Sequence, residues 1–192
     1  MYQVNAKVVG TSVLLQHRFP LPTYEEMGQG GHKSTGAKDY RDEWRQSLYV
    51  DEKNGVYQPA SHFELSMTKA AASFKVTGKR GKSYKDLVAA NVVIDPEKIL
   101  FGIENPKDLD TDADKNLYLD LRPVVIQRAR VVRIRPAFKP GWELGFTINV
   151  MDDELPSGIL QDILTLAGKT VGIGDYRPKF GRFSVAQFEV LK

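Results

Sequence analysis

The chain has 192 residues, a formal net charge of +3 and a sequence pI of about 9.0. Hydrophobic residues make up 42% and charged residues 27%, which is typical of a folded chain and excludes a wholly disordered or fibrous protein. The absence of cysteine excludes disulfides, a cysteine nucleophile and thiolate metal sites. With neither a long apolar run nor a signal-peptide pattern, we expect no membrane segment and a cytoplasmic location.

The first predicted element is a strand over residues 2–19. Val4, Ala6 and Val8 alternate with other residues, which is the pattern of a half-buried strand. Residues 20–36 follow as a loop rich in proline, glycine and serine.

The next elements are two predicted helices with a hairpin between them. Aromatic residues spaced four apart indicate a helix over residues 38–48. The dipeptide Asn54-Gly55 predicts a type I′ hairpin turn. Residues 61–77 are expected to form a helix that begins with a capping box between Ser61 and Glu64.

The middle of the chain alternates polar loops with short apolar runs. Residues 79–84 are expected to form a basic loop, followed by a strand over residues 87–94. Residues 99–103 are a candidate pairing partner for that strand. Residues 105–116 are expected to form an acidic loop.

The last third of the chain contains three predicted strands and one helix. A long strand over residues 123–135 is expected to pair with residues 144–150 across a turn at Pro140-Gly141. A helix over residues 157–167 and a closing strand over residues 182–191 complete the chain.

Without the loops, the predicted order is strand, helix, strand, strand, helix, strand. This order is typical of the α+β, ferredoxin-like (RRM-like) βαββαβ plan, an antiparallel sheet with both helices on one face. We expect a single domain over residues 1–192, with insertions at about 20–58 and 78–122. RNA-recognition modules of this plan present bases on the open sheet face.

The positive charge is concentrated in three segments, at residues 75–85, 122–143 and 169–182. Convergence of such segments on one face is the footprint of a nucleic-acid-binding protein. In the first segment the candidate binding residues are Lys79, Arg80 and Lys82. The alternative is that each segment is an ordinary solvated surface.

The second basic segment carries four candidate binding residues on one predicted strand: Arg128, Arg130, Arg133 and Arg135. A regular strand would place two of these arginines on each face. A one-residue bulge at Val131-Val132 would bring all four to one side, where they would match several phosphates. The alternative is a surface strand whose arginines pair with acids.

The third basic segment is rich in glycine and interleaves cations with aromatic rings. Its candidate nucleic-acid-binding residues are Gly172, Gly174, Tyr176, Arg177, Lys179, Phe180 and Arg182. Glycines let backbone approach a ligand, cations neutralise phosphates, and rings stack on bases, as single strands require. The alternative is a tight turn with core aromatic residues. Phe183 begins the closing strand and is expected to be buried.

No metal or cofactor site is expected. The alternating aspartates at residues 108–114 lack the glycine and the bidentate glutamate of a calcium loop. The three histidines lie too far apart to form a recognised metal motif. A catalytic role for His17 or His32 stays open, because RNA cleavage by a histidine requires only local geometry.

The residues Val8-Val9-Gly10-Thr11-Ser12-Val13-Leu14-Leu15, the ferredoxin-like order and the late glycine-rich segment resemble the RAMP superfamily. That superfamily comprises RNA-binding proteins of CRISPR effector complexes, including backbone subunits that polymerise along guide RNA. The resemblance implies RNA binding by residues 172–181 and by basic residues near the open sheet face. The ending from Gly172 to Phe183 also resembles phage-encoded proteins, which implies a phage or mobile-element member acting in a host cytoplasm.

The sequence is therefore consistent with three functions. The first is a non-enzymatic protein that binds RNA or single-stranded DNA, as a homo-oligomer or as a subunit of a ribonucleoprotein complex. In it, residues 20–36 or 79–84 would reach a neighbouring subunit. The second is a RAMP-type endoribonuclease. The third is a phage accessory protein that binds a host factor or a nucleotide signal. We favour the first.

Overall fold

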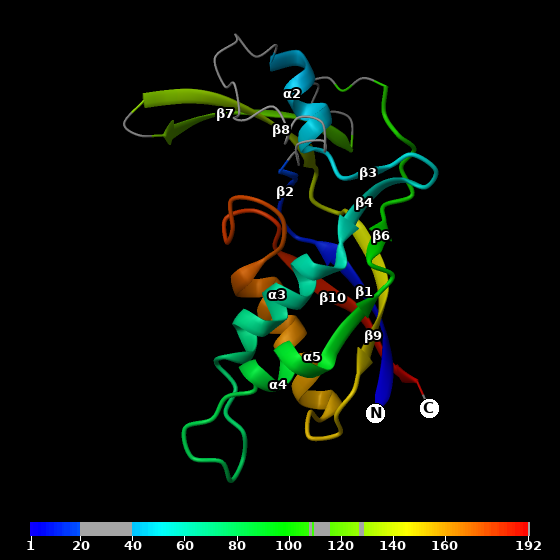
Figure 1. The fold of residues 1–192 in the computed structure, drawn as a ribbon, viewed down its shortest axis with the longest axis vertical. Coiled ribbons are helices and arrows are strands. Elements are labelled where there is room, and N and C mark those ends of the chain that lie inside the picture. Colours follow the sequence, from blue (N-terminus) through cyan, green and yellow to red (C-terminus); the bar gives the residue numbers. More distant parts are fainter. Residues whose placement is uncertain (20–39, 108, 110–115, 127–128, 192) are drawn as a thin grey trace, which may run out of the picture.

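The structure is a computed structural model that describes residues 1–19, 40–107, 109, 116–126 and 129–191. It is a mixed α+β structure whose sheets are antiparallel, with four α-helices in the described residues. Figure 1 shows a sheet with helices on one side in the lower part and a further group of strands above it. None of the described helices is both long and apolar enough to cross a membrane.

The larger sheet has four strands in the order β10-β1-β9-β5, and every neighbouring pair is antiparallel. Its strands are β1 (Tyr2–Gly10), β5 (Val92–Asp95), β9 (Glu143–Val150) and β10 (Phe183–Leu191). Alternation along β1 buries Val4, Ala6 and Val8, as the sequence predicts.

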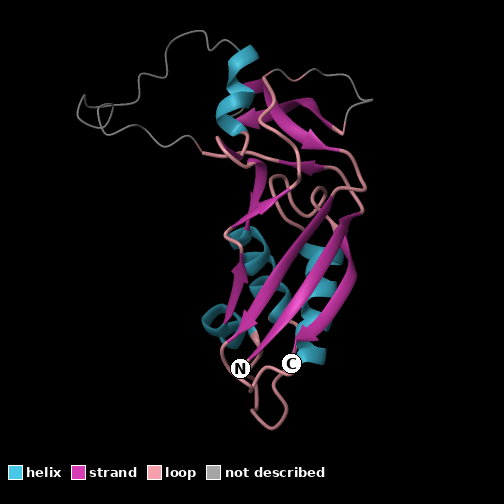
Figure 2. Cartoon of the chain, turned by 90° about the vertical axis from the view of Figure 1, so that its right-hand side faces the viewer, coloured by secondary structure: helices cyan, strands magenta, loops and turns pink. Residues whose placement is uncertain are grey.

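Within the described part of the chain, helices cover only one face of this sheet (Figure 2). They are α3 (Ala60–Ala71), α4 (Lys85–Asn91) and α5 (Ser157–Leu166), which continues into a π-helical turn, Ala167–Val171. The helix face of the sheet and the helices share an aromatic core. The ring of Phe63 on α3 lies 4.7 Å from that of Phe146 and 5.4 Å from that of Phe183.

The remaining strands form two small sheets above the larger one. One has the order β2-β8-β7, from β2 (Leu14–Leu15), β8 (Ala129–Phe138) and β7 (Leu117–Ile126). The other has the order β3-β4-β6, from β3 (Val50–Asp51), β4 (Gly55–Pro59) and β6 (Lys98–Leu100). Helix α2 (Tyr40–Ser47) lies beside them. We call β7 and β8 together the hairpin arm, because they project from the body in Figure 1.

The single strand expected over residues 123–135 and its expected pairing are both wrong, because these residues belong to two strands, β7 and β8, that pair with each other. Strand β8 pairs with β7 along its whole length and continues through Pro136 to Phe138. Residues 144–150 instead form part of β9, which lies between β1 and β5. Strand β5 therefore takes the place in the larger sheet that the sequence pattern assigns to residues 123–135.

The strand expected over residues 87–94 is also wrong in its first half, where residues 85–91 form α4. Short apolar runs do not by themselves distinguish a helix from a strand. Residues 98–100 pair with β4, and not with residues 87–94.

The helix expected over residues 38–48 is confirmed by α2, and a hairpin in this region is confirmed by the pairing of β3 with β4. The type I′ turn at Asn54-Gly55 is wrong, because Asp51 pairs with Gly55 and Asn54 lacks the positive φ that such a turn requires. The expected capping box is wrong: α3 begins at Ala60 after Pro59, without a side-chain cap, and ends at Ala71. Its Glu64 carboxylate accepts a hydrogen bond from the backbone N–H of Ile94, 2.9 Å away, because β5 lies beside α3.

We expect Phe183→Ala to lower the free energy of unfolding by roughly 3–5 kcal/mol, because this side chain is only 2% exposed and fills the core between helix and sheet. Urea denaturation measures the change. Val190→Ala on the same strand is the control, since Val190 is 44% exposed and should lose far less. A small loss for Phe183→Ala would contradict this account of the core.

Candidate nucleic-acid interface

A loop after α5 and its π-helical turn, residues 172–182, joins the two parts of the structure; we call it the glycine loop. Backbone hydrogen bonds fasten it to the segment around β2. The N–H of Asp175 donates to the carbonyl of Leu15 over 2.8 Å, and the N–H of Gly181 donates to that of Val13 over 2.8 Å. The loop is thus held against β2 by its own backbone.

Two of the loop's glycines are required by close packing. Gly174 has φ +73°, and a Cβ there would lie 2.5 Å from the Leu15 carbonyl oxygen. Gly172 has φ +72°, and a Cβ there would lie 2.9 Å from the Phe180 carbonyl oxygen. This geometry supports the tight-turn interpretation of both glycines, in place of backbone access for a ligand.

Tyr176 is the aromatic residue that the loop presents to solvent. Its side chain is 50% exposed, and its backbone has φ +58°, a conformation that costs a residue other than glycine free energy. Its ring lies edge-on to Phe180 at 5.9 Å between centroids. The Arg135 guanidinium lies 6.0 Å from the Tyr176 ring centroid. The loop thus holds this ring outward beside a cation.

Phe180 points the other way, into a small apolar cluster with Leu15 and Ala137. Its side chain is 5% exposed, and the Arg122 guanidinium lies 4.4 Å from its ring centroid. The ring is therefore not open to a stacking base, and the core-aromatic interpretation holds for Phe180. Lys179, by contrast, is exposed at the loop surface.

The hairpin arm carries the predicted arginines, and its register shows which face each one occupies. The pairing of β7 with β8 runs without interruption, so the expected bulge at Val131-Val132 is wrong. Arg133 lies opposite Arg122, and both belong to the face on which the glycine loop packs; we call this the loop face. Arg130 lies on the outer face, and Arg128 lies outside the described residues.

Two loop-face arginines are engaged with acids. The Arg135 Nε lies 2.6 Å from an Asp175 carboxylate oxygen, and Arg135 is only 8% exposed. The two groups are not aligned as a hydrogen bond, so the attraction is chiefly Coulombic. The Arg122 Nε donates to Asp120 over 2.5 Å, which raises the pKa of Arg122. Of the four predicted strand arginines, Arg135 is thus paired with an acid, and Arg122, which is not one of the four, is paired as well.

A polar network lies close to the loop, and the sequence patterns do not reveal it. The side-chain amide of Gln58 donates to His62 Nδ1 over 2.5 Å, and the amide of Gln16 donates to Gln58 over 3.1 Å. Burial, with the nearby Arg177 charge, lowers the pKa of His62 to about 4. His62 is therefore neutral at pH 7 and serves as a hydrogen-bond acceptor.

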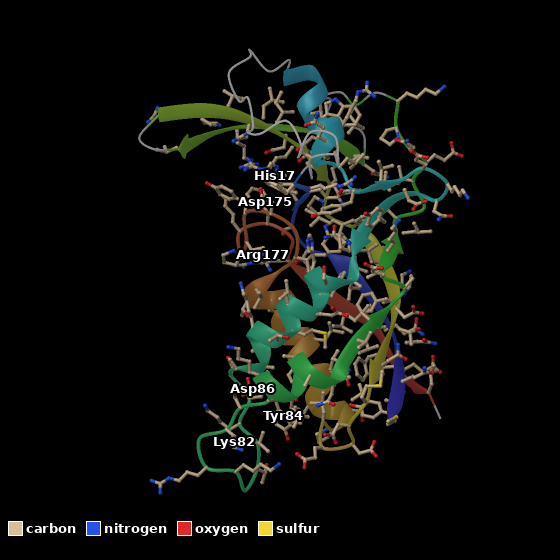
Figure 3. All side chains as sticks on the ribbon, in the orientation of Figure 1. His17, Lys82, Tyr84, Asp86, Asp175 and Arg177 are labelled. Carbon is tan, nitrogen blue, oxygen red and sulfur yellow. The ribbon has the colours of Figure 1, made fainter. Side chains whose placement is uncertain are left out.

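One side of the molecule brings several chemically active groups together. Figure 3 shows His17, Asp175 and Arg177 along the same side, where the chain leaving β2 passes the glycine loop. His17, Arg177 and Arg182 are exposed, and the Arg182 Nε donates to the Pro178 carbonyl over 2.7 Å. His32 lies outside the described residues.

The first basic segment does not join this surface. Lys79, Arg80 and Lys82 are exposed in a turn at the other end of the molecule, where Figure 3 labels Lys82. Lys79 also pairs with Glu154 over 2.7 Å. The expected convergence of all three basic segments on one face is therefore wrong.

The open face of the larger sheet has a different character. A shallow groove of about 440 Å³ lies on it, lined by Asn5, Lys7, Asp95, Thr147 and their neighbours. Lys7 pairs with Glu143 over 2.7 Å, and the Thr147 hydroxyl donates to Asn5 over 3.0 Å. The lining of the groove is chiefly apolar and its charges are mixed. Among the described residues, the strongest combination of cations and an exposed ring therefore lies at the glycine loop. In the described residues no group of His, Asp or Glu side chains is placed to hold a metal ion.

Comparison with known proteins gives a likeness in fold. No family model and no curated protein matches the sequence. Among solved structures, the chain is similar to one in the cryo-EM structure of the Type III-B Cmr-beta bound to cognate target RNA, with a TM-score of 0.54 and 14% identity. The match covers 100% of this chain and 61% of that one, so this chain spans less than two thirds of its neighbour's length.

We expect Gly174→Ala to destabilise the protein by more than the roughly 1–2 kcal/mol that a left-handed backbone costs a non-glycine residue. The extra loss comes from the Leu15 contact. Gly102→Ala is the matched control, because Gly102 has φ +71° and a Cβ added there would meet no other atom within 4 Å. Thermal and urea denaturation of both variants give the comparison. Equal losses would show that the Leu15 contact does not fix the loop.

Proposed function

We propose that this protein is a non-enzymatic RNA-binding protein that takes a single strand across the glycine loop and the loop face of the hairpin arm. The observation that carries the proposal is the half-exposed Tyr176 ring, held outward by a left-handed backbone beside cations. A structure that bears the cost of such a backbone commonly uses it at a functional site.

Residues of the glycine loop and of the hairpin arm have different roles in this binding. The Tyr176 ring stacks on a base, which is tolerant of sequence because every base has a π-face. Arg177 and Lys179 on the loop and Arg133 on the arm contact phosphates, which position a strand without reading it. The two glycines let the loop pack on β2, and Phe180 anchors the loop from beneath.

We also propose that the larger sheet and its helices form the ferredoxin-like fold that the sequence pattern predicts. The antiparallel order β10-β1-β9-β5, with α3 and α5 as the two crossover helices, fits a ferredoxin-like unit. The chain is then one domain with two insertions, one at about 20–58 as expected. The second insertion lies between β5 and β9 and includes the hairpin arm, whereas the sequence pattern predicts it at about residues 78–122.

The fold likeness to a chain of an RNA-bound Type III-B Cmr-beta structure supports a RAMP relationship for this chain and RNA as its partner. By the same relationship, the protein would act as a subunit of a ribonucleoprotein complex. The basic turn at Lys79, Arg80 and Lys82 would then make secondary contacts, away from the main path.

A mobility-shift assay that compares RNA, single-stranded DNA and duplex of equal length tests the proposal. We expect RNA to bind and the duplex to bind more weakly, because a stacking site needs unpaired bases. Tight binding to duplex alone, or no binding to any of the three, would overturn it.

Tyr176→Ala should weaken RNA binding by about 1–3 kcal/mol and leave the salt dependence unchanged, because it removes stacking without removing a charge. Tyr176→Phe keeps the ring and should retain the affinity. Filter binding at several salt concentrations measures both quantities. Equal losses for the two variants would mean that the hydroxyl, and not the ring, contributes to binding.

Arg133→Ala should flatten the slope of log affinity against log salt by up to about 0.7, the value for one neutralised phosphate on a single strand. Arg130→Ala is the matched control, because Arg130 lies on the same strand and faces the other side. We expect the slope to change for Arg133→Ala and to stay nearly constant for Arg130→Ala. The reverse pattern would place the strand on the outer face of the arm.

A further inference from the structure

His62, in the first turn of α3, ends a chain of hydrogen bonds that begins beside the glycine loop. Gln16 directly follows Leu15, whose carbonyl accepts from the Asp175 N–H. The Gln16 side chain is fully buried and its amide reaches Gln58, which is buried as well. The amide of Gln58 lies 2.5 Å from His62 Nδ1. The network therefore connects the base of the loop to an imidazole on the helix.

Two backbone groups fix the direction of every hydrogen bond in this chain. The Tyr49 N–H must donate, so the atom it meets at 3.0 Å is the Gln16 carbonyl oxygen Oε1. The Tyr57 carbonyl must accept, so the atom that it meets at 2.8 Å is Gln16 Nε2. Gln16 Nε2 also donates to Gln58 Oε1, which leaves Gln58 Nε2 to donate to His62. His62 Nδ1 is therefore the acceptor, and the proton of the neutral imidazole is on Nε2.

The imidazole of His62 is held in place, and its Nε2–H is accessible to a ligand. The Tyr49 ring meets the imidazole edge-on, with 5.6 Å between the ring centroids. His62 is partly buried, yet no residue in the described part of the chain hydrogen-bonds to its Nε2, and this atom is not sealed from solvent. A buried network behind the ring and an open N–H in front of it suit a donor that binds a ligand.

The fixed tautomer makes His62 selective for groups that accept a hydrogen bond. Protonation of Nδ1 would break the bond from Gln58, and burial with the nearby Arg177 charge lowers the pKa of His62 to about 4. At neutral pH the ring therefore donates through Nε2 and cannot accept there. The keto oxygen of uracil or guanine fits this N–H. The exocyclic amino group that cytosine or adenine carries in its place would set two donors against each other.

His62 lies beside the residues to which we assign RNA binding. Arg177 is near enough for its charge to affect the pKa of His62, and it directly follows Tyr176, the exposed ring of the loop. Asp175 affects the pKa of Tyr49, whose ring packs on His62, in the same way. With Arg177 on the phosphate between two nucleotides, one base would stack on Tyr176 and the edge of the next base would face the His62 N–H.

We infer that His62 is a specificity-determining residue, whose Nε2–H donates to the keto oxygen of a uracil or guanine next to the base stacked on Tyr176. The inference rests on the proposed function, because it requires a strand on the glycine loop. Gln16 and Gln58 are positioning residues, since they keep the proton on Nε2 and contact no base. One hydrogen bond gives a modest preference, about two- to tenfold in affinity.

Filter binding of the full chain to oligouridine and oligocytidine of equal length tests the inference, because the two pyrimidines differ by a keto oxygen against an amino group. We expect wild-type protein to bind oligouridine about two- to tenfold more tightly. His62→Phe keeps a ring without the donor, so it should lose this preference and keep the affinity for oligocytidine. Tight but equal binding of both by wild-type protein would overturn the inference alone, whereas binding of neither would overturn the proposed function itself.

The tautomer can be tested without RNA. At pH 7 the nitrogen NMR signals of His62 should be those of a neutral ring with its proton on Nε2. Gln58→Leu removes the donor to Nδ1, so it should mix the two tautomers and reduce the preference for oligouridine, although His62 itself is unchanged. A wild-type ring with its proton on Nδ1, or a Gln58→Leu variant that keeps the full preference, would overturn the role of the network.

Discussion

The backbone contact between the glycine loop and β2 determines the geometry of the candidate interface. Gly174 and Leu15 lie too close for a Cβ, and the Asp175 N–H is committed to the Leu15 carbonyl. With that contact fixed, the loop can turn Phe180 inward and Tyr176 outward over a short stretch of chain. The π-helical turn after α5 ends at the start of this loop, so the loop also links the larger sheet and its helices to the hairpin arm.

Some arginines of the hairpin arm hold the glycine loop in place, and others are exposed and available to a ligand. Their spacing in the sequence does not show which arginine belongs to which group. Arg135 is buried against Asp175, where removal of either partner would leave a charge without compensation in a low-dielectric setting. Arg122 is held by Asp120 and covers the Phe180 ring. These two arginines fix the loop on the arm. The positive potential available to a ligand comes from the more exposed cations around them.

Local sequence patterns predicted features that are set within a few residues. The chain reversal near Asn54-Gly55, although not its turn type, and the burial of Phe183 follow from turn chemistry and strand alternation. The pairing of β8 with β7 could not be predicted this way, because an apolar strand pattern does not specify its partner. The role of Gly174 was missed for a related reason: its requirement comes from Leu15, which is distant in sequence.

The two faces of β8 separate two kinds of interaction along a single strand. The loop face combines cations with one exposed ring, so the binding proposed there would be dominated by charge and would weaken as salt screens it. The outer face is chiefly apolar, and burial of such surface does not weaken as salt rises. Because alternation places Arg133 and Val132 on opposite sides, substitutions one residue apart can alter either interaction alone. A strand of this kind gives one arm two surfaces of different chemistry, so a ligand on one face would not compete for the other.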